Sequence, residues 1–259
     1  MRLFDTHAHI GLMHKDPIEQ LLVIQQAKRA GVEHIVSICN TLNDFEIVYG
    51  NLRSSKSTYH AVGVSPTEAG NFLGSWESKV LSYGRYDRVV AIGETGLDYE
   101  KFAFSRFKQV ELFLKHLEIA RRLDLPVIIH NRNAHDDILD ILRSKIPGKG
   151  AIFHCYSGDW ASASKALDLQ VWFSFAGNIT FRNSKGLHQA LANLPADRIL
   201  IESESPFLAP FAFRGQRNRP ANISETLNAV AQIRGVDPNE MAEIIYLNSL
   251  KAFGLDENA

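Results

Sequence analysis

The chain has 259 residues, 45% of them apolar, which is enough to bury one large core. Its 28 Lys and Arg residues balance 29 Asp and Glu residues, and a net charge of -1 argues against a broad electrostatic grip on nucleic acid or on an anionic membrane. Two widely separated cysteines, Cys39 and Cys155, exclude a disulfide-rich scaffold. There is no apolar leader and no run of the roughly 18 to 20 apolar residues that span a bilayer. We therefore expect a monomer in the cytoplasm, without membrane attachment.

Short apolar segments alternate with amphipathic segments along the chain. The apolar segments have the length and composition of strands that are buried on both faces of a parallel sheet. The eight predicted strands are Arg2–His9, His34–Cys39, Tyr59–Val64, Val89–Glu94, Pro126–His130, Ala151–His154, Val171–Ser174 and Ile199–Glu204. The predicted helices are Ile18–Ala30, Asp44–Leu52, Phe72–Tyr83, Phe104–Leu123, Ala134–Ser144, Trp160–Leu167, Lys185–Leu194, Ile223–Arg234 and Pro238–Phe253.

This alternation predicts one domain over residues 1–259, with the α/β fold of a (β/α)8 or TIM barrel. In the longest predicted helix, three- and four-residue spacing produces an apolar stripe that should face the core. The stripe consists of Phe104, Phe107, Val110, Phe113, Leu114 and Leu117. Barrels of this kind carry their active sites at the C-terminal ends of the strands, so the residues there identify the candidate site.

Histidines or acids close five of the eight predicted strands at that end. His7 and His9 close the first strand; they project to the same face about 6 to 7 Å apart, where they can bind one divalent cation. Each residue taken alone could be an ordinary core or capping residue, but their shared position at strand ends favours a common site. The set is His7, His9, Glu94, His130, His154 and Glu204, and it contains enough ligands for two cations.

Several motifs make the chain resemble the TatD-type metal-dependent deoxyribonucleases of the amidohydrolase superfamily, over nearly its whole length. They are Asp5-Thr6-His7-Ala8-His9, Gly93-Glu94-Thr95-Gly96-Leu97-Asp98, Leu125-Pro126-Val127-Ile128-Ile129-His130-Asn131-Arg132, His154-Cys155-Tyr156-Ser157-Gly158, and Ser205-Pro206-Phe207-Leu208-Ala209-Pro210 followed by Arg214-Gly215. The resemblance implies a distorted TIM barrel with one or two divalent metals, held by His7, His9, Glu94, His130 and His154. It also implies Mg- or Mn-dependent cleavage of DNA, including removal of nucleotides from a 3′ end.

Two positions depart from the pattern of that family. Glu204 stands in Glu202-Ser203-Glu204-Ser205-Pro206, where the family usually has an aspartate, so its carboxylate reaches about 1.5 Å further. Ser65, in Gly63-Val64-Ser65-Pro66, stands where members often have a histidine. We expect the fold and the metal site to survive both changes, and the rate and the substrate preference to be less secure.

We assign His7, His9 and Glu204 to one cation, His130 and His154 to the other, and Glu94 to the bridge between them, as a hypothesis. A bound divalent cation lowers the pKa of its water, and a second one can stabilise charge on the leaving oxygen. Phosphodiester hydrolysis requires both effects. Glu204 would accept the proton of the attacking water if its longer side chain reaches it. Glu202 shares strand parity with Glu204, and it either orients a ligand histidine or pairs with a polar group of the core.

Substrate contacts are predicted at the rim of the barrel. Arg132 shares strand parity with His130, and its planar fork can bind phosphate oxygens. Arg214 lies in an arginine-rich segment with interleaved aromatic residues, a composition suited to backbone contacts and base stacking. We expect the partner to be a DNA strand end or another phosphodiester. The nitrogen and oxygen ligands suit several metals: Zn or Ni in purified protein, and Mg or Mn in turnover.

Two other functions are compatible with the same residues. The metals could polarise a carbonyl group, which would make the protein an amidohydrolase, esterase or lactonase acting on a small substrate. Because of the changes at Glu204 and Ser65, the protein could also be a catalytically silent metal-binding protein.

Overall fold

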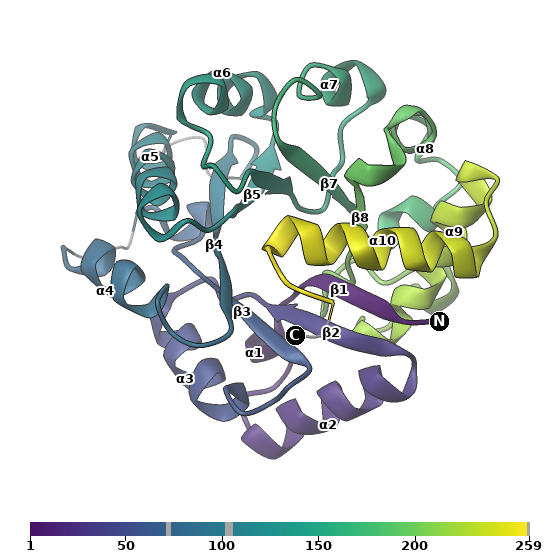
Figure 1. The fold of residues 1–259 in the computed structure, drawn as a ribbon, viewed down its shortest axis with the longest axis horizontal. Helices are drawn as coiled ribbons and strands as arrows, with labels where there is room; N and C mark the ends of the chain where they lie inside the picture. The colour runs from purple at the N-terminus through teal and green to yellow at the C-terminus, as the bar shows by residue number, and fades with distance from the viewer. Residues whose placement is uncertain (71–73, 102–105, 258–259) are drawn as a thin grey trace.

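The computed structural model describes residues 1–70, 74–101 and 106–257. Its centre is one sheet of eight parallel strands that pair in sequence order from β1 to β8. Figure 1 shows this sheet wrapped into a nearly closed barrel with the helices around it. The strands are β1 (Leu3–Ala8), β2 (Val32–Ser37), β3 (Thr58–Val62), β4 (Val89–Asp98), β5 (Val127–Arg132), β6 (Ala151–Phe153), β7 (Val171–Phe175) and β8 (Ile199–Ile201). The predicted TIM-barrel fold class is therefore confirmed.

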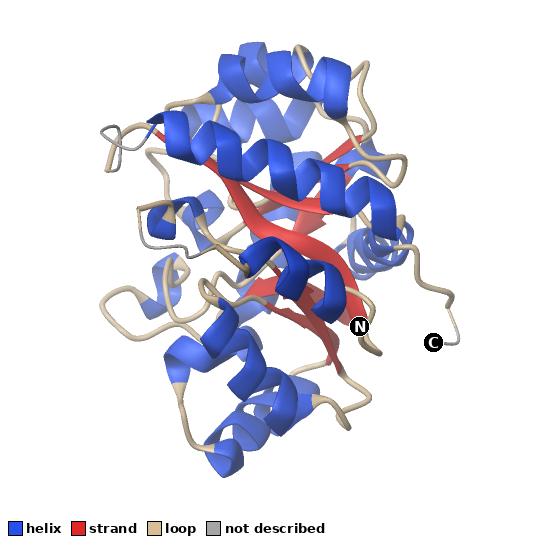
Figure 2. Cartoon of the chain, turned by 90° about the vertical axis from the view of Figure 1, so that its left-hand side faces the viewer, coloured by secondary structure: helices blue, strands red, loops and turns tan. Residues whose placement is uncertain are grey.

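The helices lie outside the strands, which the side view in Figure 2 shows as blue segments around the red sheet. Asp16 caps α2 by accepting hydrogen bonds from two backbone amides, and a proline follows it at the first helical position; Asp237 caps α10 in the same way. The helices are α1 (Ile10–Met13), α2 (Pro17–Arg29), α3 (Leu42–Leu52), α4 (Trp76–Tyr83), α5 (Arg106–Leu123), α6 (His135–Lys145), α7 (Trp160–Ser164), α8 (Lys185–Asn193), α9 (Ile223–Arg234) and α10 (Pro238–Phe253). No helix in the three described ranges is long and apolar enough to cross a membrane.

The stripe predicted for α5 is partly wrong. Phe107 is 90% exposed and Leu114 is 38% exposed, whereas Phe113 and Leu117 are buried as predicted. The face of α5 that packs on the barrel instead includes two polar residues, Gln109 and His116, which hydrogen-bond backbone groups of neighbouring segments. The predicted starts of two helices, at residues 72–73 and 104–105, and the stripe residue Phe104 lie outside the described residues.

One end of the barrel is covered by α10. Residues near the beginnings of the strands form a core inside the barrel, among them Phe4, Ile128 and Leu200, and the α10 residues Tyr246 and Phe253 pack against it. The rings of Phe4 and Phe253 stack with centroids 5.7 Å apart, and Figure 1 shows α10 crossing the middle of the barrel. This packing leaves the end at which the strands terminate for a functional site.

The barrel closes between β1 and the segment that follows β8. Strand β8 stops at Ile201, three residues earlier than predicted, and Glu204 beyond it adopts a left-handed backbone with φ 54°. The closing contacts are a parallel bridge between Ala8 and Ser205 and a hydrogen bond of 3.0 Å from the Glu204 amide to the His7 carbonyl. The same contacts therefore close the barrel and place three candidate ligands: His7, His9 and Glu204.

Candidate metal centre

His7 and His9 lie at the end of β1 and point to the same side, as strand alternation predicts. Their Nε2 atoms are 3.2 Å apart, and both side chains are buried. The Nε2 atom of His7 is 3.3 Å from an oxygen of Glu204 and 3.8 Å from an oxygen of Glu94. These atoms form the first group of potential cation ligands.

Glu94 lies within β4 and turns its two carboxylate oxygens to different pairs of histidines. Its Oε2 atom is 3.8 Å from His7 Nε2 and 3.9 Å from His9 Nε2. Its Oε1 atom is 2.8 Å from His130 Nδ1 and 3.6 Å from His154 Nε2. This is the arrangement that a carboxylate shared by two cations requires.

Glycine residues beside Glu94 let β4 approach β5 closely. Gly96 pairs with His130 and has φ +132°, and a Cβ atom added to it would collide with the His130 carbonyl. Gly93 has φ +151°, and its Cβ atom would lie 2.8 Å from the carbonyl oxygen of Ile128. Both positions therefore need glycine, and the close approach brings Glu94 within reach of the His130 ring.

His130 and His154, at the ends of β5 and β6, form the second group of potential ligands with Glu94. Nδ1 of His130 and Nε2 of His154 are 3.4 Å apart. The rings of His154 and His7 stack with centroids 4.0 Å apart, so the two groups are in direct contact. The ligand atoms of His7, His9 and Glu94 lie within 4.8 Å of one another, as do those of Glu94, His130 and His154, and those of His7, His154, Glu202 and Glu204. Each of these sets is compact enough to hold one ion.

Glu204 reaches the centre despite its left-handed backbone and its longer side chain. Its Oε2 atom lies 3.3 Å from His7 Nε2 and 3.7 Å from His154 Nδ1, and it is buried without a hydrogen-bond partner among the described residues. Glu202 is buried behind it, 3.4 Å from His154 Nδ1, and accepts a hydrogen bond of 2.9 Å from the Cys155 amide. A buried carboxylate oxygen without a hydrogen-bond partner, surrounded by imidazole nitrogens, is a donor set that suits a divalent cation.

The surroundings shift the pKa values of the histidines in opposite directions. Burial lowers the pKa of His7 well below its ordinary value and lowers that of His9 to about 4, so both rings are neutral at pH 7. Burial also lowers the pKa of His130 and His154, but adjacent carboxylates outweigh it and leave both values raised.

The carboxylates of the centre also have shifted pKa values. Burial raises the pKa of Glu204 to about 8, with further contributions from Glu202 and Glu94 that His154 opposes. Burial acts in the same direction on Glu94, but His154 and His130 outweigh it, and the pKa of Glu94 lies well below its ordinary value. Glu94 is therefore ionised at neutral pH, whereas Glu204 can take up a proton there.

Comparison with known proteins identifies the family. A family model described as TatD related DNase matches residues 4–254. The chain belongs to the TatD family. YcfH of Escherichia coli K12, named an uncharacterized metal-dependent hydrolase, is 34% identical over 262 residues, which cover 99% of this chain and 97% of YcfH. YabD of Bacillus subtilis, which carries the same description, is 32% identical over 256 residues, covering 98% and 100% of the two chains.

A solved structure agrees with this result. The crystal structure of YjjV, a TatD homologue from Escherichia coli K12, has a TM-score of 0.91 and 27% identity, and the match covers 98% of this chain and 99% of that one. The family predicted from the sequence motifs is confirmed, and the protein is a metal-dependent hydrolase of the TatD family.

Sequence reasoning missed one residue that contacts a candidate ligand, Asp98. Its Oδ2 atom is 3.2 Å from His130 Nε2, on the side of the ring that faces away from Glu94. Its Oδ1 atom accepts hydrogen bonds from the amides of Glu100 and Lys101, which fix the carboxylate. Asp98 lies four residues beyond Glu94 on β4, with the same strand parity, and this parity was the signal that could have revealed it.

The two predicted rim arginines lie apart from the six clustered residues. Arg132, at the end of β5, forms two hydrogen bonds of 2.7 and 3.0 Å with the Glu100 carboxylate. The guanidinium of Arg214 lies 5.7 Å from the centroid of the Phe181 ring. Ser65 is buried and accepts hydrogen bonds from the amide and hydroxyl of Thr67, so it begins a short helical turn.

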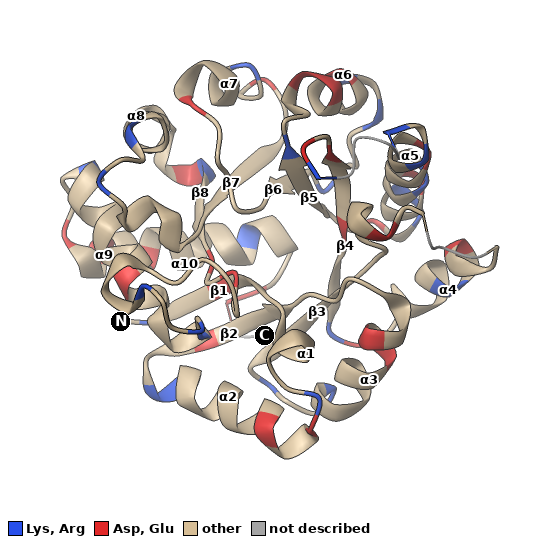
Figure 3. Cartoon of the chain, turned by 180° about the vertical axis from the view of Figure 1, so that it is seen from behind, with Lys and Arg blue, Asp and Glu red and all other residues tan. Residues whose placement is uncertain are grey.

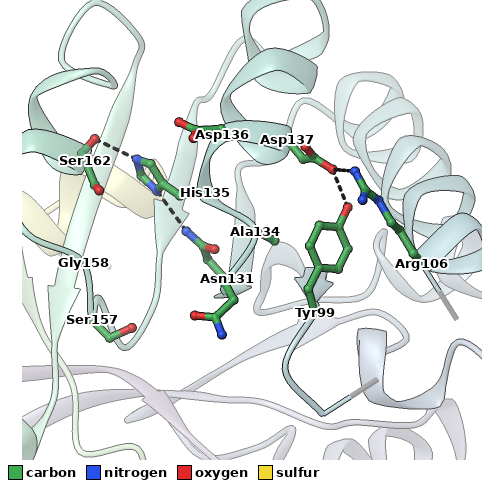
Figure 4. Close-up of a pocket in the computed structure, with 11 residues that line it drawn as sticks. Tyr99, Arg106, Asn131, Ala134, His135, Asp136, Asp137, Ser157, Gly158 and Ser162 are labelled. Atoms are coloured by element: carbon green, nitrogen blue, oxygen red, sulfur yellow. Dashed lines mark hydrogen bonds and ion pairs between the residues drawn. The ribbon is translucent and has the colours of Figure 1, made fainter. Parts of the chain in front are cut away.

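A polar cavity of about 470 Å³ is lined by residues of β5, α6 and the segments that follow β4 and β6, and none of the six candidate ligands lines it. Figure 4 shows that its lining groups satisfy one another: Tyr99 and Arg106 converge on Asp137, while His135 lies between Asn131 and Ser162. Asn131 follows the candidate ligand His130 directly within β5, so its side chain points to the opposite side of the strand from that ligand. Figure 3 shows Asp and Glu in the middle of the barrel near β1, and mixed charges on the outer helices.

Proposed function

We propose that this TatD-family hydrolase is a deoxyribonuclease that cleaves phosphodiester bonds near the 3′ end of single-stranded DNA. The observation that carries the proposal is Glu94, whose two oxygens face two separate pairs of histidines. A pair of cations held in this way is the arrangement that serves in-line displacement at phosphorus, because it stabilises both the attacking and the leaving oxygen.

The residues of the chain divide the work as follows. His7, His9 and Glu94 would hold one cation, and His130, His154 and Glu94 would hold the other. Glu204 would accept the proton of the attacking water, because its carboxylate reaches the centre, 3.3 Å from His7 Nε2. Glu202 orients the His154 ring from behind.

The metals follow from the same ligands. Imidazole nitrogen binds Zn and Ni tightly, while carboxylate oxygen and water also accept Mg and Mn. We expect Zn or Ni in the purified protein and turnover with added Mg or Mn, which elemental analysis and rate measurements after exchange of the metal would check.

The test is incubation with a 5′-labelled single-stranded oligonucleotide in the presence of Mg or Mn. We expect progressive shortening from the 3′ end that is lost in His130→Ala. The matched control is His188→Ala on α8, since that histidine hydrogen-bonds the Ile179 carbonyl away from the centre. An unshortened oligonucleotide, or shortening that persists in His130→Ala, would contradict the proposal.

One observation favours a second candidate, a metal-dependent hydrolase of small carbonyl substrates. The Arg132 fork, predicted to bind phosphate, is engaged by Glu100. To bind a phosphate group, Arg132 would have to break its hydrogen bonds with Glu100. A small neutral substrate would not require Arg132. Hydrolysis of an ester, amide or lactone without any cleavage of DNA would support this second candidate.

A further inference from the structure

Exposed apolar side chains gather on the loop that follows β8. Phe207 is 50% exposed, Leu208 is 40% exposed and Phe211 is 60% exposed. They are three of the twelve large apolar side chains that are exposed in the described chain, and they fall within five positions. A local concentration of this kind on a surface is typical of a binding site.

Backbone contacts fix the course of this loop and therefore the positions from which its apolar side chains project. The amide of Phe207 donates to the Glu204 carbonyl at 2.8 Å, and the amide of Phe211 donates to the Thr180 hydroxyl at 2.7 Å. The loop also packs against Gly177, where an added Cβ atom would collide with the Leu208 carbonyl. A rigid loop that keeps apolar rings in water has its binding surface already formed.

Phe207 connects this surface to the metal centre. Its ring meets the ring of His9 edge to face, with centroids 6.0 Å apart and an interplanar angle of 71°. Further along, the rings of Phe211 and Phe181 are in edge contact, and the Arg214 guanidinium lies over Phe181. The loop that follows β8 therefore carries one aromatic ring against a candidate metal ligand and a second one in an aromatic pair with a cation beside it.

We propose that Phe207 is a stacking platform for the unpaired base of the nucleotide beside the bond that is cleaved. This inference rests on the proposed nuclease function. A sugar alone separates a base from its phosphate, so a phosphate held between the two groups of ligands places the adjoining base over the neighbouring loop. Every base offers a π face, and stacking on an aromatic side chain is independent of sequence. A base within a duplex is covered on both faces, so the platform selects single-stranded ends.

The experiment compares two single-stranded oligonucleotides that differ in one group. One has a normal 3′-terminal nucleotide, and the other has an abasic sugar there. We expect the wild-type protein to favour the first in KM, and Phe207→Ala to reduce the ratio of the two KM values by about 5- to 100-fold. Phe207→Trp should restore the ratio. Phe107→Ala is the matched control, because it removes an exposed phenylalanine of α5 far along the chain.

Each outcome decides the question. If Phe207→Ala weakens both substrates equally and leaves the KM ratio intact, the ring only supports His9 and the platform is wrong. Fluorescence anisotropy with the same oligonucleotides separates the two proposals. Binding that depends on the base and on Phe207, without any cleavage, would overturn the nuclease and keep the platform. Binding that does not depend on the base would overturn the platform.

Discussion

The histidines of β1 and those of β5 and β6 face the same carboxylate, Glu94, but different groups lie behind them. The Nδ1 atoms of His7 and His9 are buried without a hydrogen-bond partner in the described part of the chain. In contrast, the far nitrogen of His130 lies 3.2 Å from Asp98, and that of His154 lies 3.4 Å from Glu202. A carboxylate therefore lies behind each ring of the second pair and behind neither ring of the first, although His154 Nδ1 also has no hydrogen-bond partner among the described residues.

This difference shows that two cation sites can share the ligand Glu94 while different contacts orient the histidine rings of each site. The His7 ring is positioned by stacking on His154, and the His9 ring by its contact with Phe207. The rings at β5 and β6 depend on negative charge, which orients them and strengthens them as ligands. Changes to carboxylates should therefore separate the two sites.

The largest effect is expected for Glu94→Gln, because this change removes the charge that both sites share. We expect both cations to be lost and kcat/KM to fall about 1000-fold, equivalent to about 4 kcal/mol of transition-state stabilisation. Elemental analysis and rate measurements would check this, with the rim variant Glu100→Gln as control. A Glu94→Gln protein that still holds two ions would break the assignment of the bridge.

Removing one histidine should affect one site more than the other. We expect His130→Ala to lose the cation of the β5 and β6 side while retaining that of the β1 side, and His9→Ala to do the reverse. The rate should fall about 100-fold or more in each, because an in-line displacement needs both ions. Calorimetric titration with Mn counts the sites. Loss of both ions in either variant would show that the two halves are one indivisible site.

A smaller effect is expected for Asp98→Asn, which keeps the size of the side chain and removes its charge. Binding of the cation on the β5 and β6 side should weaken about 10- to 100-fold, as is typical for partners of ligand histidines. The affinity of the β1 side should stay within the error of the titration. Equal weakening of both sites would refute the contrast drawn between packing and carboxylates.

The smallest effect on the centre is expected for replacement of His116, a buried histidine outside the metal centre. This variant tests how much one such histidine contributes to acid unfolding, separately from loss of metal. Burial lowers its pKa from 6.5 to about 4, and its Nε2 accepts a hydrogen bond from the Val64 amide. The unfolded chain therefore takes up a proton at higher pH than the folded chain. The free energy of unfolding should fall by about 1.4 kcal/mol per pH unit as the pH drops from 6.5 towards 4.

Urea unfolding of the chelator-treated protein between pH 7 and pH 4 measures this slope, with His116→Gln as the comparison. The glutamine keeps an acceptor but does not titrate, so its slope should be shallower by that amount. Equal slopes would show that His116 does not contribute to the acid sensitivity of the fold.

The barrel was predictable because its signals are local. Apolar runs of strand length alternate with amphipathic helices, and parallel strands bring their C-terminal ends to one rim, so the six clustered residues could be named. Asp98 was missed because β4 continues past Glu94, and no local pattern shows where a buried strand ends. The Arg132–Glu100 pair could not be foreseen because several exposed charges compete for each partner.

Two further differences have a physical origin beyond local pattern. Glu204 lies beyond the end of β8 and has a left-handed backbone conformation, which the surrounding loop imposes. On α5, Gln109 and His116 are buried because they hydrogen-bond neighbouring segments. Since both residues are polar, a search for apolar residues did not identify the buried face of the helix.

The contacts between β1 and the segment that follows β8 link the stability of the barrel to metal binding. The amide of His9 donates to the Ser205 carbonyl, and the amide of Glu204 donates to the His7 carbonyl. An ion bound by these side chains also clamps the two extremities of the sheet, which are nearly two hundred positions apart in sequence. Metal binding should therefore slow deuterium uptake at these two amides more than at other amides of the chain. Removal of the metal with a chelator should increase uptake at these two amides the most.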